Sequence, residues 1–247
     1  MLFRANSAAG ACLFERPHHR DVALVLQSLD APALSERRCY FGGGTAMALR
    51  YGEYRESVDI DFVVSELEGY RDLRQMLGNA RGLLPIAREG IEVELAREVR
   101  ADQYGIRTHV RSGESTIKFE IILEPRIDLA APNEDDRICG IQTLAQIDLA
   151  AEKLLANADR WADESVYSRD LIDLAMMPAD RRLLQAACVK AEVAYGQSVR
   201  RSLSQAVEGL EAQPGRLEAC MTALSVDGVT RAQLWQAIRK VARRLPG

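Results

Sequence analysis

The stretch FGGGTAMALRYGEYRESVDIDFVV, residues 41–64, contains three features in a fixed order. An apolar segment ends in three glycines, a helix-forming segment follows, and residues 58–64 alternate before they become wholly apolar. Fourteen residues separate Gly44 from Asp59, which leaves room for a short helix and a turn around residues 53–56. The order predicts a strand, a glycine turn, a helix and a second, adjacent strand.

The glycine turn fits two interpretations. Three glycines before a helix can simply form a tight turn that needs positive φ. A turn without side chains also lets backbone N–H groups approach phosphates, and the first turn of a helix favours negative charge. On this second interpretation Gly43, Gly44 and Thr45 bind a nucleotide, with the Thr45 hydroxyl as a further contact.

Asp59 and Asp61 flank Ile60, so a strand directs both carboxylates to one face and the apolar side chain to the other. Two like charges this close disfavour joint ionisation unless a cation or strong donors offset them. Mg²⁺ takes carboxylate oxygens and bridges to substrate phosphates. Solvated aspartates at a sheet edge are the alternative. Because a glycine turn precedes them at a fitting distance, we predict a site for two Mg²⁺ ions, with Mn²⁺ as the other suitable metal.

These residues carry a resemblance to a known family. The stretch 41–64 resembles the glycine turn and Asp-x-Asp strand of the DNA polymerase β-like minimal nucleotidyltransferases. More narrowly, GGTAMALRYG, Ser57 and DIDF are similar to the AbiEii/AbiGii toxin nucleotidyltransferases. The resemblance implies that the aspartates bind metal and that the glycine turn binds an NTP.

Folds of this kind bring a third acidic residue from a later strand. In STIKFEIIL, residues 115–123, Glu120 lies on the face opposite Phe119 and Ile121. We expect Glu120 to be the third metal ligand. Glu94 in IEVEL is the competing candidate.

A second block of the resemblance lies in AEKLLANADR and YSRDLIDL. Lys153 and Arg160 are seven residues apart, on nearly one face of a helix, and Asp170 and Asp173 are three apart on the next. Taken alone they are surface charges, but they are similar to the lysine-x₆-arginine and Arg-Asp-x-x-Asp-Leu motifs of the same toxins. The resemblance implies that Lys153 and Arg160 contact nucleotide phosphates. It also implies that Asp170 acts near the reacting centre, whereas Asp173 is expected only to anchor its helix.

Hydrophobic periodicity divides the chain into two halves. In the first half an amphipathic helix at residues 18–29 and three alternating segments predict a mixed sheet with flanking helices; these segments are 91–99, 104–110 and 115–123. After Pro132 helical periodicity takes over, no strand is expected, and Thr230 is expected to cap the last helix. We therefore predict an α+β fold with a nucleotidyltransferase domain at residues 1–132 and an all-α helical bundle at residues 133–247.

The charge balance sets a condition on nucleic-acid binding. A formal net charge of -4 gives no global attraction to RNA, so contact with RNA requires a local basic patch. The last helix ends in four basic residues: Arg239, Lys240, Arg243 and Arg244. We favour the interpretation that they complement the helix dipole over the interpretation that they bind RNA.

Cysteine usage and the lack of long apolar runs indicate a cytoplasmic protein. The five cysteines are odd in number and far apart, so we expect them to be reduced and mostly buried: Cys12, Cys39, Cys139, Cys188 and Cys220. No apolar run approaches the roughly 20 residues of a membrane helix, and the N-terminus lacks a signal-peptide pattern. The three histidines are expected at the surface.

Together these patterns predict a metal-dependent nucleotidyltransferase that transfers NMP from an NTP to an acceptor. Both domains are expected to contribute catalytic residues: Asp59, Asp61, Lys153 and Asp170. The resemblance implies a bacterial toxin with a cognate antitoxin that acts on tRNA. The alternatives are a small-molecule or protein acceptor, and a nucleotide-binding regulator without catalysis. The four acidic and basic residues of the site are all present, which disfavours the regulator.

Overall fold

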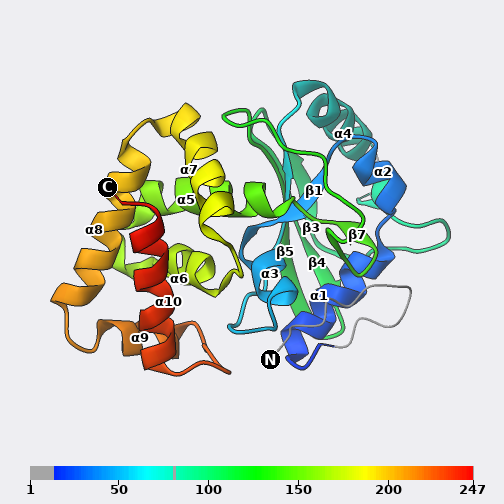
Figure 1. Ribbon diagram of the computed structural model, residues 1–247. Coiled ribbons are helices and arrows are strands. Elements are labelled where there is room, and N and C mark those ends of the chain that lie inside the picture. Colours follow the sequence, from blue (N-terminus) through cyan, green and yellow to red (C-terminus); the bar gives the residue numbers. More distant parts are fainter. Residues whose placement is uncertain (1–13, 80–81, 247) are drawn as a thin grey trace. The chain divides into compact units, whose positions relative to one another are not determined.

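The computed structural model describes residues 14–79 and 82–246 (Figure 1). The chain forms two compact units. The first contains the segment that ends at Arg50 together with Ser57–Ala145, and the second contains Tyr51–Glu56 together with the chain from Gln146 onward. None of the helices in these described ranges is both long enough and apolar enough to cross a bilayer.

A five-stranded mixed sheet forms the centre of the first unit, in the order β1-β2-β5-β4-β3 (Figure 1). Its strands are β1 (Tyr40–Gly42), β2 (Ile60–Val64), β3 (Leu95–Ala101), β4 (Gly105–Ser112) and β5 (Ser115–Leu123). The strands β2 and β5 are parallel, and the other neighbours are antiparallel. The buried rings of Phe41, Phe62 and Phe119 pack side by side across three strands, with centroids 5.7 and 5.6 Å apart. The predicted α+β class is confirmed.

Helices flank this sheet, as predicted. They are α1 (Pro17–Ser28), α2 (Ala31–Ser35), α3 (Gly43–Arg50) and α4 (Leu67–Asn79), with a short 3₁₀ helix at Leu84–Ile86. The helix α1 packs against β4 and β5, and α4 packs against β2 and β3. The buried stripe of α1 contains Val22, Val25 and Leu26, which is the stripe that the amphipathic pattern predicts.

Residues 133–145 belong to the first unit, because a small hairpin packs there. The strands β6 (Arg137–Ile138) and β7 (Ile141–Gln142) pair with each other, and the Leu144 N–H donates to the Phe41 carbonyl at 2.9 Å. Arg50 at the end of α3 binds the Asp136 carboxylate. The expectation that no strand follows Pro132 is wrong here, since two-residue strands are too short to show periodicity.

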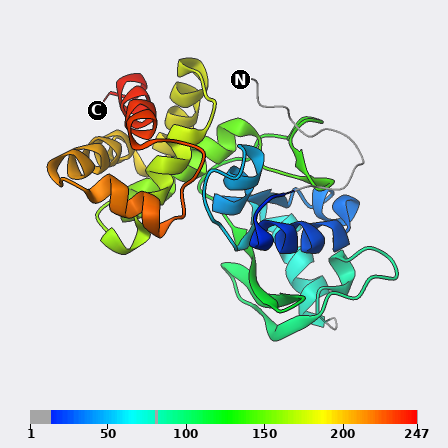
Figure 2. The ribbon, with the colours of Figure 1, turned by 90° about the horizontal axis from the view of Figure 1, so that it is seen from below.

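The regular elements of the second unit are all helices among its described residues, as predicted (Figures 1 and 2). Its α-helices are α5 (Gln146–Arg160), α6 (Arg169–Met176), α7 (Arg181–Tyr195), α8 (Ser198–Ala212), α9 (Arg216–Ala223) and α10 (Arg231–Arg244), and a 3₁₀ turn lies at Glu164–Val166. The helix α5 packs against α6, α7 and α8. It is therefore the central element of this unit.

The cysteine prediction is confirmed only in part. Cys39, Cys188 and Cys220 are free and buried. Cys139 is disulfide-bonded, so the expectation of a reduced thiol is wrong for this residue, because sequence spacing reveals only local cysteine pairs. Cys12 lies outside the described residues.

Thr230 caps α10 as predicted, and its contribution to stability is measurable. The Thr230 hydroxyl accepts from the Gln233 N–H at 3.3 Å, and the Gln233 side chain accepts from the Thr230 N–H at 2.8 Å. We expect Thr230→Ala to lower the free energy of unfolding by about 1 kcal/mol, because the Gln233 N–H loses the hydroxyl that accepts its hydrogen bond. Thr230→Ser keeps the hydroxyl and is the control. Equal urea midpoints for the two variants would contradict the assignment.

Candidate functional site

The glycine turn and the aspartate strand meet in the first unit. Gly42 is the register partner of Asp61 across β1 and β2. The next residue, Gly43, has φ +69°, and a Cβ at this position would lie 2.5 Å from Oδ2 and 3.0 Å from Cβ of Asp61. Gly43 is therefore glycine for two reasons, its left-handed backbone and the approach of the carboxylate. Gly44 lies within α3 and is not among the glycines with positive φ.

Hydrogen bonds hold the segment that leads to Asp59. The Thr45 side chain is buried, and its hydroxyl donates to the Ser57 hydroxyl at 2.9 Å. The Ser57 N–H in turn donates to Nε2 of His19 at 3.3 Å. His19 is fully buried, so the expectation of a surface histidine is wrong for it. It precedes Val22 by three residues on α1, a spacing that places it on the buried stripe.

Glu120 lies next to Asp61, but cations already occupy its carboxylate. The two residues are register partners on the parallel strands β2 and β5. The Glu120 carboxylate pairs with the Lys118 ammonium, and with Arg107 Nε at 3.0 Å. The competing candidate, Glu94, is exposed and pairs with Arg111. Glu94 directly precedes β3, which is the edge strand farthest from β1 in the sheet order. Of the two glutamates, only Glu120 lies beside the aspartate strand.

The carboxylates of Asp59 and Asp61 suit a hard cation. Both residues are half-buried. Burial alone would lower the pKa of Lys118, but the carboxylates of Glu120, Asp59 and Asp61 raise it. Within residues 14–79 and 82–246 no three His, Cys, Asp or Glu side chains are grouped to hold a metal. Two aspartates nevertheless fit Mg²⁺, which keeps several waters and completes its coordination with substrate phosphates. Asp59 and Asp61 would hold it.

The lysine and aspartate motifs meet inside the second unit. Lys153 on α5 is 5% exposed, and Asp170 and Asp173 on α6 are 2% and 0% exposed. The Lys153 ammonium lies 3.1 Å from Asp170 Oδ1 and 2.6 Å from Asp173 Oδ2. Arg160 forms a two-pronged pair with Asp170, at 2.7 and 2.9 Å. These residues are not the surface charges that each motif suggests when taken alone.

Two further residues complete this cluster, and sequence reasoning missed both. Tyr54 and Arg55 lie in the connection between α3 and β2, where the sequence indicates only a turn. The Tyr54 hydroxyl donates to Asp173 Oδ1 at 2.6 Å, and Arg55 donates to both oxygens at 2.6 and 2.9 Å. Asp173 therefore binds residues far from its own helix in the sequence and does more than anchor that helix. No local pattern reveals such a contact, because 118 residues separate Arg55 from Asp173.

The cluster pairs three cations with carboxylates, and Arg160 also interacts with the carboxylate of Asp159. Arg55, Lys153 and Arg160 face Asp170 and Asp173. Burial alone would raise the pKa of each aspartate, but Lys153 and Arg160 bring the pKa of Asp170 below its ordinary value, and Arg55 and Lys153 do so for Asp173. Both carboxylates therefore stay ionised near neutral pH.

Known proteins similar to this chain include one family and one solved structure. The family model described as nucleotidyl transferase AbiEii toxin, type IV TA system, matches residues 25–245. Among solved structures, a proposed nucleotidyltransferase from H. pylori is similar with a TM-score of 0.49 and 16% identity, over 94% of this chain and 97% of that chain. No curated protein shows significant sequence similarity.

Replacement of Gly43 tests the contact with Asp61. Gly43→Ala and Gly90→Ala both place a side chain at positive φ, which costs about 1–2 kcal/mol. An added Cβ at Gly90 meets nothing within 4 Å, so Gly90→Ala is the matched control for the backbone term. We expect Gly43→Ala to lower the free energy of unfolding further, because Asp61 has to move. Equal losses in urea denaturation would show that the contact exerts no constraint.

Replacement of Asp173 tests the buried cluster. We expect Asp173→Asn to lower the free energy of unfolding by about 3–5 kcal/mol at pH 7, because Arg55 and Lys153 keep their charges without this carboxylate. The folded-state pKa of Asp173 is depressed, so its contribution is present above its unfolded pKa of about 4 and is lost as the pH falls below that value. The difference between wild type and variant should therefore shrink in acid. Asp227→Asn, which changes an exposed aspartate, is the control. If the difference in unfolding free energy between wild type and Asp173→Asn stays constant below pH 4, the assignment is contradicted.

Proposed function

This chain belongs to the AbiEii nucleotidyl transferase toxin family of type IV toxin–antitoxin systems, and we propose that it uses Mg²⁺ to transfer NMP from an NTP to tRNA. Membership makes the protein a nucleotidyltransferase and implies an NTP substrate and an antitoxin partner. The metal and the tRNA acceptor are the proposed parts. The observation that carries the metal proposal is the approach of Gly43 to Asp61, because it brings the turn proposed to bind phosphate next to the carboxylate proposed to bind the metal.

The first unit is proposed to bind the NTP. Backbone N–H groups at the start of α3 face phosphate oxygens, and the positive end of the helix dipole favours their charge. Thr45 contributes by holding Ser57, since its hydroxyl is already bonded there. When bound at Asp59 and Asp61, Mg²⁺ supplies positive charge for the attacking and leaving oxygens.

The transfer itself needs one bond made and one bond broken. An acceptor hydroxyl oxygen attacks the α-phosphorus in line with the pyrophosphate leaving group. The new P–O bond forms as the bond to the bridging oxygen breaks, the hydroxyl proton passes to water, and pyrophosphate departs. Because the protein supplies no covalent intermediate, orientation and charge stabilisation account for the catalysis.

The second unit is proposed to supply Lys153 and Arg160 to the phosphates. The match of both residues to the lysine-x₆-arginine motif of the family supports this role. Asp170 binds both cations, and its lowered pKa makes it a weak proton acceptor. We therefore propose that Asp170 orients Lys153 and Arg160, and we favour this role over that of a general base.

A direct assay tests the proposed reaction. Purified protein is incubated with α-labelled NTPs, Mg²⁺ and total tRNA, and the RNA is resolved on a denaturing gel. We expect labelled tRNA, no label with EDTA, and at least a 100-fold loss of rate in a folded Asp59→Asn variant. Label on a small molecule or protein instead of tRNA would identify a different acceptor. Transfer that persists in EDTA would contradict the metal proposal.

Lys153→Met tests the proposed phosphate contact. Asp170 keeps Arg160 and Asp173 keeps Arg55 in this variant, so the fold should survive. We expect NTP affinity, measured by calorimetry without acceptor, to fall by about tenfold or more, which corresponds to the loss of a hydrogen bond to a charged group. Lys240→Met, which removes an exposed lysine of the same unit, should leave affinity unchanged. Unchanged affinity in Lys153→Met would rule out the phosphate contact.

A further inference from the structure

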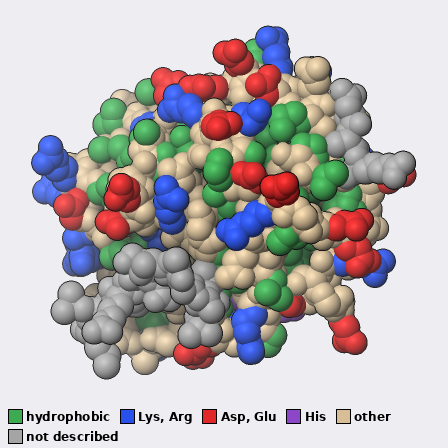
Figure 3. Space-filling model, turned by 90° about the vertical axis from the view of Figure 1, so that its right-hand side faces the viewer, with side chains coloured by type: hydrophobic (Ala, Val, Ile, Leu, Met, Phe, Trp, Pro, Cys, Tyr) green, Lys and Arg blue, Asp and Glu red, His purple; other side chains and the backbone are tan. Residues whose placement is uncertain are grey.

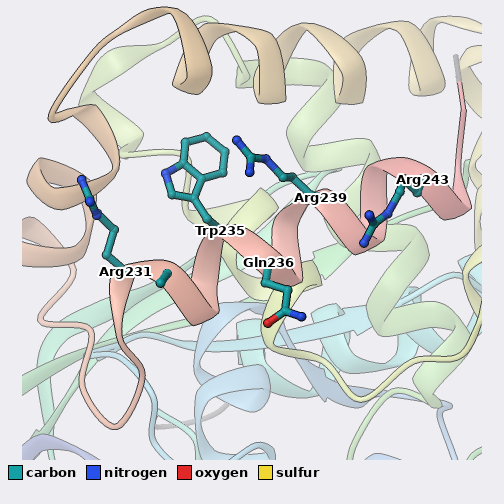
Figure 4. Close-up of a pocket in the computed structure, with 6 residues that line it drawn as sticks. Arg231, Trp235, Gln236, Arg239 and Arg243 are labelled. Carbon is teal, nitrogen blue, oxygen red and sulfur yellow. The ribbon is translucent and has the colours of Figure 1, made fainter.

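A row of basic and aromatic side chains runs along α10. Arg231, Trp235, Arg239 and Arg243 recur at every fourth position and line a surface hollow of about 430 Å³ together with Ala232 and Gln236 (Figure 4). We call these four residues the arginine row. The three arginines are exposed and Trp235 is half-buried. The helix contains no acidic residue.

The side chains of the row are partly ordered by neighbours. The Arg239 guanidinium lies 5.2 Å from the centroid of the Trp235 ring and 3.1 Å from Glu211. Arg231 pairs with Glu218. Arg243 has no hydrogen-bond or ion-pair partner among the residues that the structure describes. Three guanidinium groups thus line the hollow, and two of them pair with a carboxylate from a neighbouring helix.

Stabilisation of the helix accounts for only part of this row. A cation in the last turn complements the helix dipole, and Arg243 and Arg244 lie there. Arg231 is the first residue of the helix, where a cation opposes the dipole, and Arg239 lies between the ends. The interpretation favoured from the sequence, that the basic residues serve the dipole, therefore leaves Arg231 and Arg239 unexplained.

The chain as a whole offers a polyanion little attraction. Its net charge is -4, and the face in Figure 3 mixes acidic and basic side chains without a large basic area. An RNA substrate therefore requires a local site. Guanidinium groups bind phosphate with two parallel hydrogen bonds, and an aromatic face next to them accepts a stacked base.

We propose that the arginine row docks the RNA acceptor, with phosphates bound by Arg239 and Arg243 and a base placed against Trp235. The proposal rests on the proposed RNA acceptor. Glu211 and Glu218 hold two of the arginines when RNA is absent. Exposed ion pairs of this kind contribute little, so phosphate oxygens replace the carboxylates easily.

Equilibrium binding of labelled total tRNA, without NTP, tests the proposal. The full-length Arg239→Ala/Arg243→Ala variant is compared with wild type by fluorescence anisotropy at several KCl concentrations. We expect the Kd to rise about tenfold or more, and the slope of log K against log salt to fall by about two. Arg182→Ala, which removes an exposed arginine on α7, should change neither the Kd nor the slope beyond the effect of one distant charge.

A gain of affinity gives an independent check. Glu211→Gln frees Arg239 from its carboxylate and should tighten tRNA binding. Glu208→Gln on the same helix removes an exposed carboxylate that pairs with no arginine of the row, and it should tighten binding less. Unchanged affinity and salt slope in the double arginine variant would overturn the proposal and leave this face to a protein partner. If tRNA is labelled in the transfer assay but binding ignores the row, only this proposal fails. If binding depends on the row but no label is transferred, only the proposed reaction fails.

Discussion

The buried ion pair between Arg55 and Asp173 joins segments that lie 118 residues apart in the sequence. Asp173 is fully buried and accepts from Arg55, Tyr54 and Lys153. A buried carboxylate is unfavourable unless its oxygens are fully bonded to donors or cations, so these partners have to be present together. Arg55 lies in the connection between α3 and Asp59. The pair therefore fixes this short connection within the second unit. The connection joins the glycine turn to the aspartate strand, the two elements of the candidate nucleotide site.

The two units carry different charge clusters. In the first unit Asp59, Asp61 and Glu120 lie near Lys118, an arrangement that accommodates added positive charge. In the second unit Asp170 and Asp173 each contact two cations, so both carboxylates stay ionised although they are buried.

The sequence predicted those features whose signal is local. The glycine turn before α3, the alternation of β5 that separates Glu120 from the core, and the Thr230 cap each depend on neighbouring residues. The contacts that sequence reasoning missed join distant segments. Tyr54 and Arg55 form an ordinary turn in the sequence, and only α6 gives them a role. The hairpin at residues 137–142 is too short for periodicity, whereas the burial of His19 was visible in its helical spacing.

The double pairing of Lys153 explains why two aspartates three residues apart suit this helix. A buried ammonium group needs an anionic partner when no substrate is bound, because burial of an unpaired charge is unfavourable in free energy. Asp170 and Asp173 share this task, but each also has an arginine of its own, Arg160 and Arg55 respectively. Under the proposed function, a phosphate bound to the Lys153 ammonium would leave neither carboxylate without a cation, and the Arg55–Asp173 pair would stay intact.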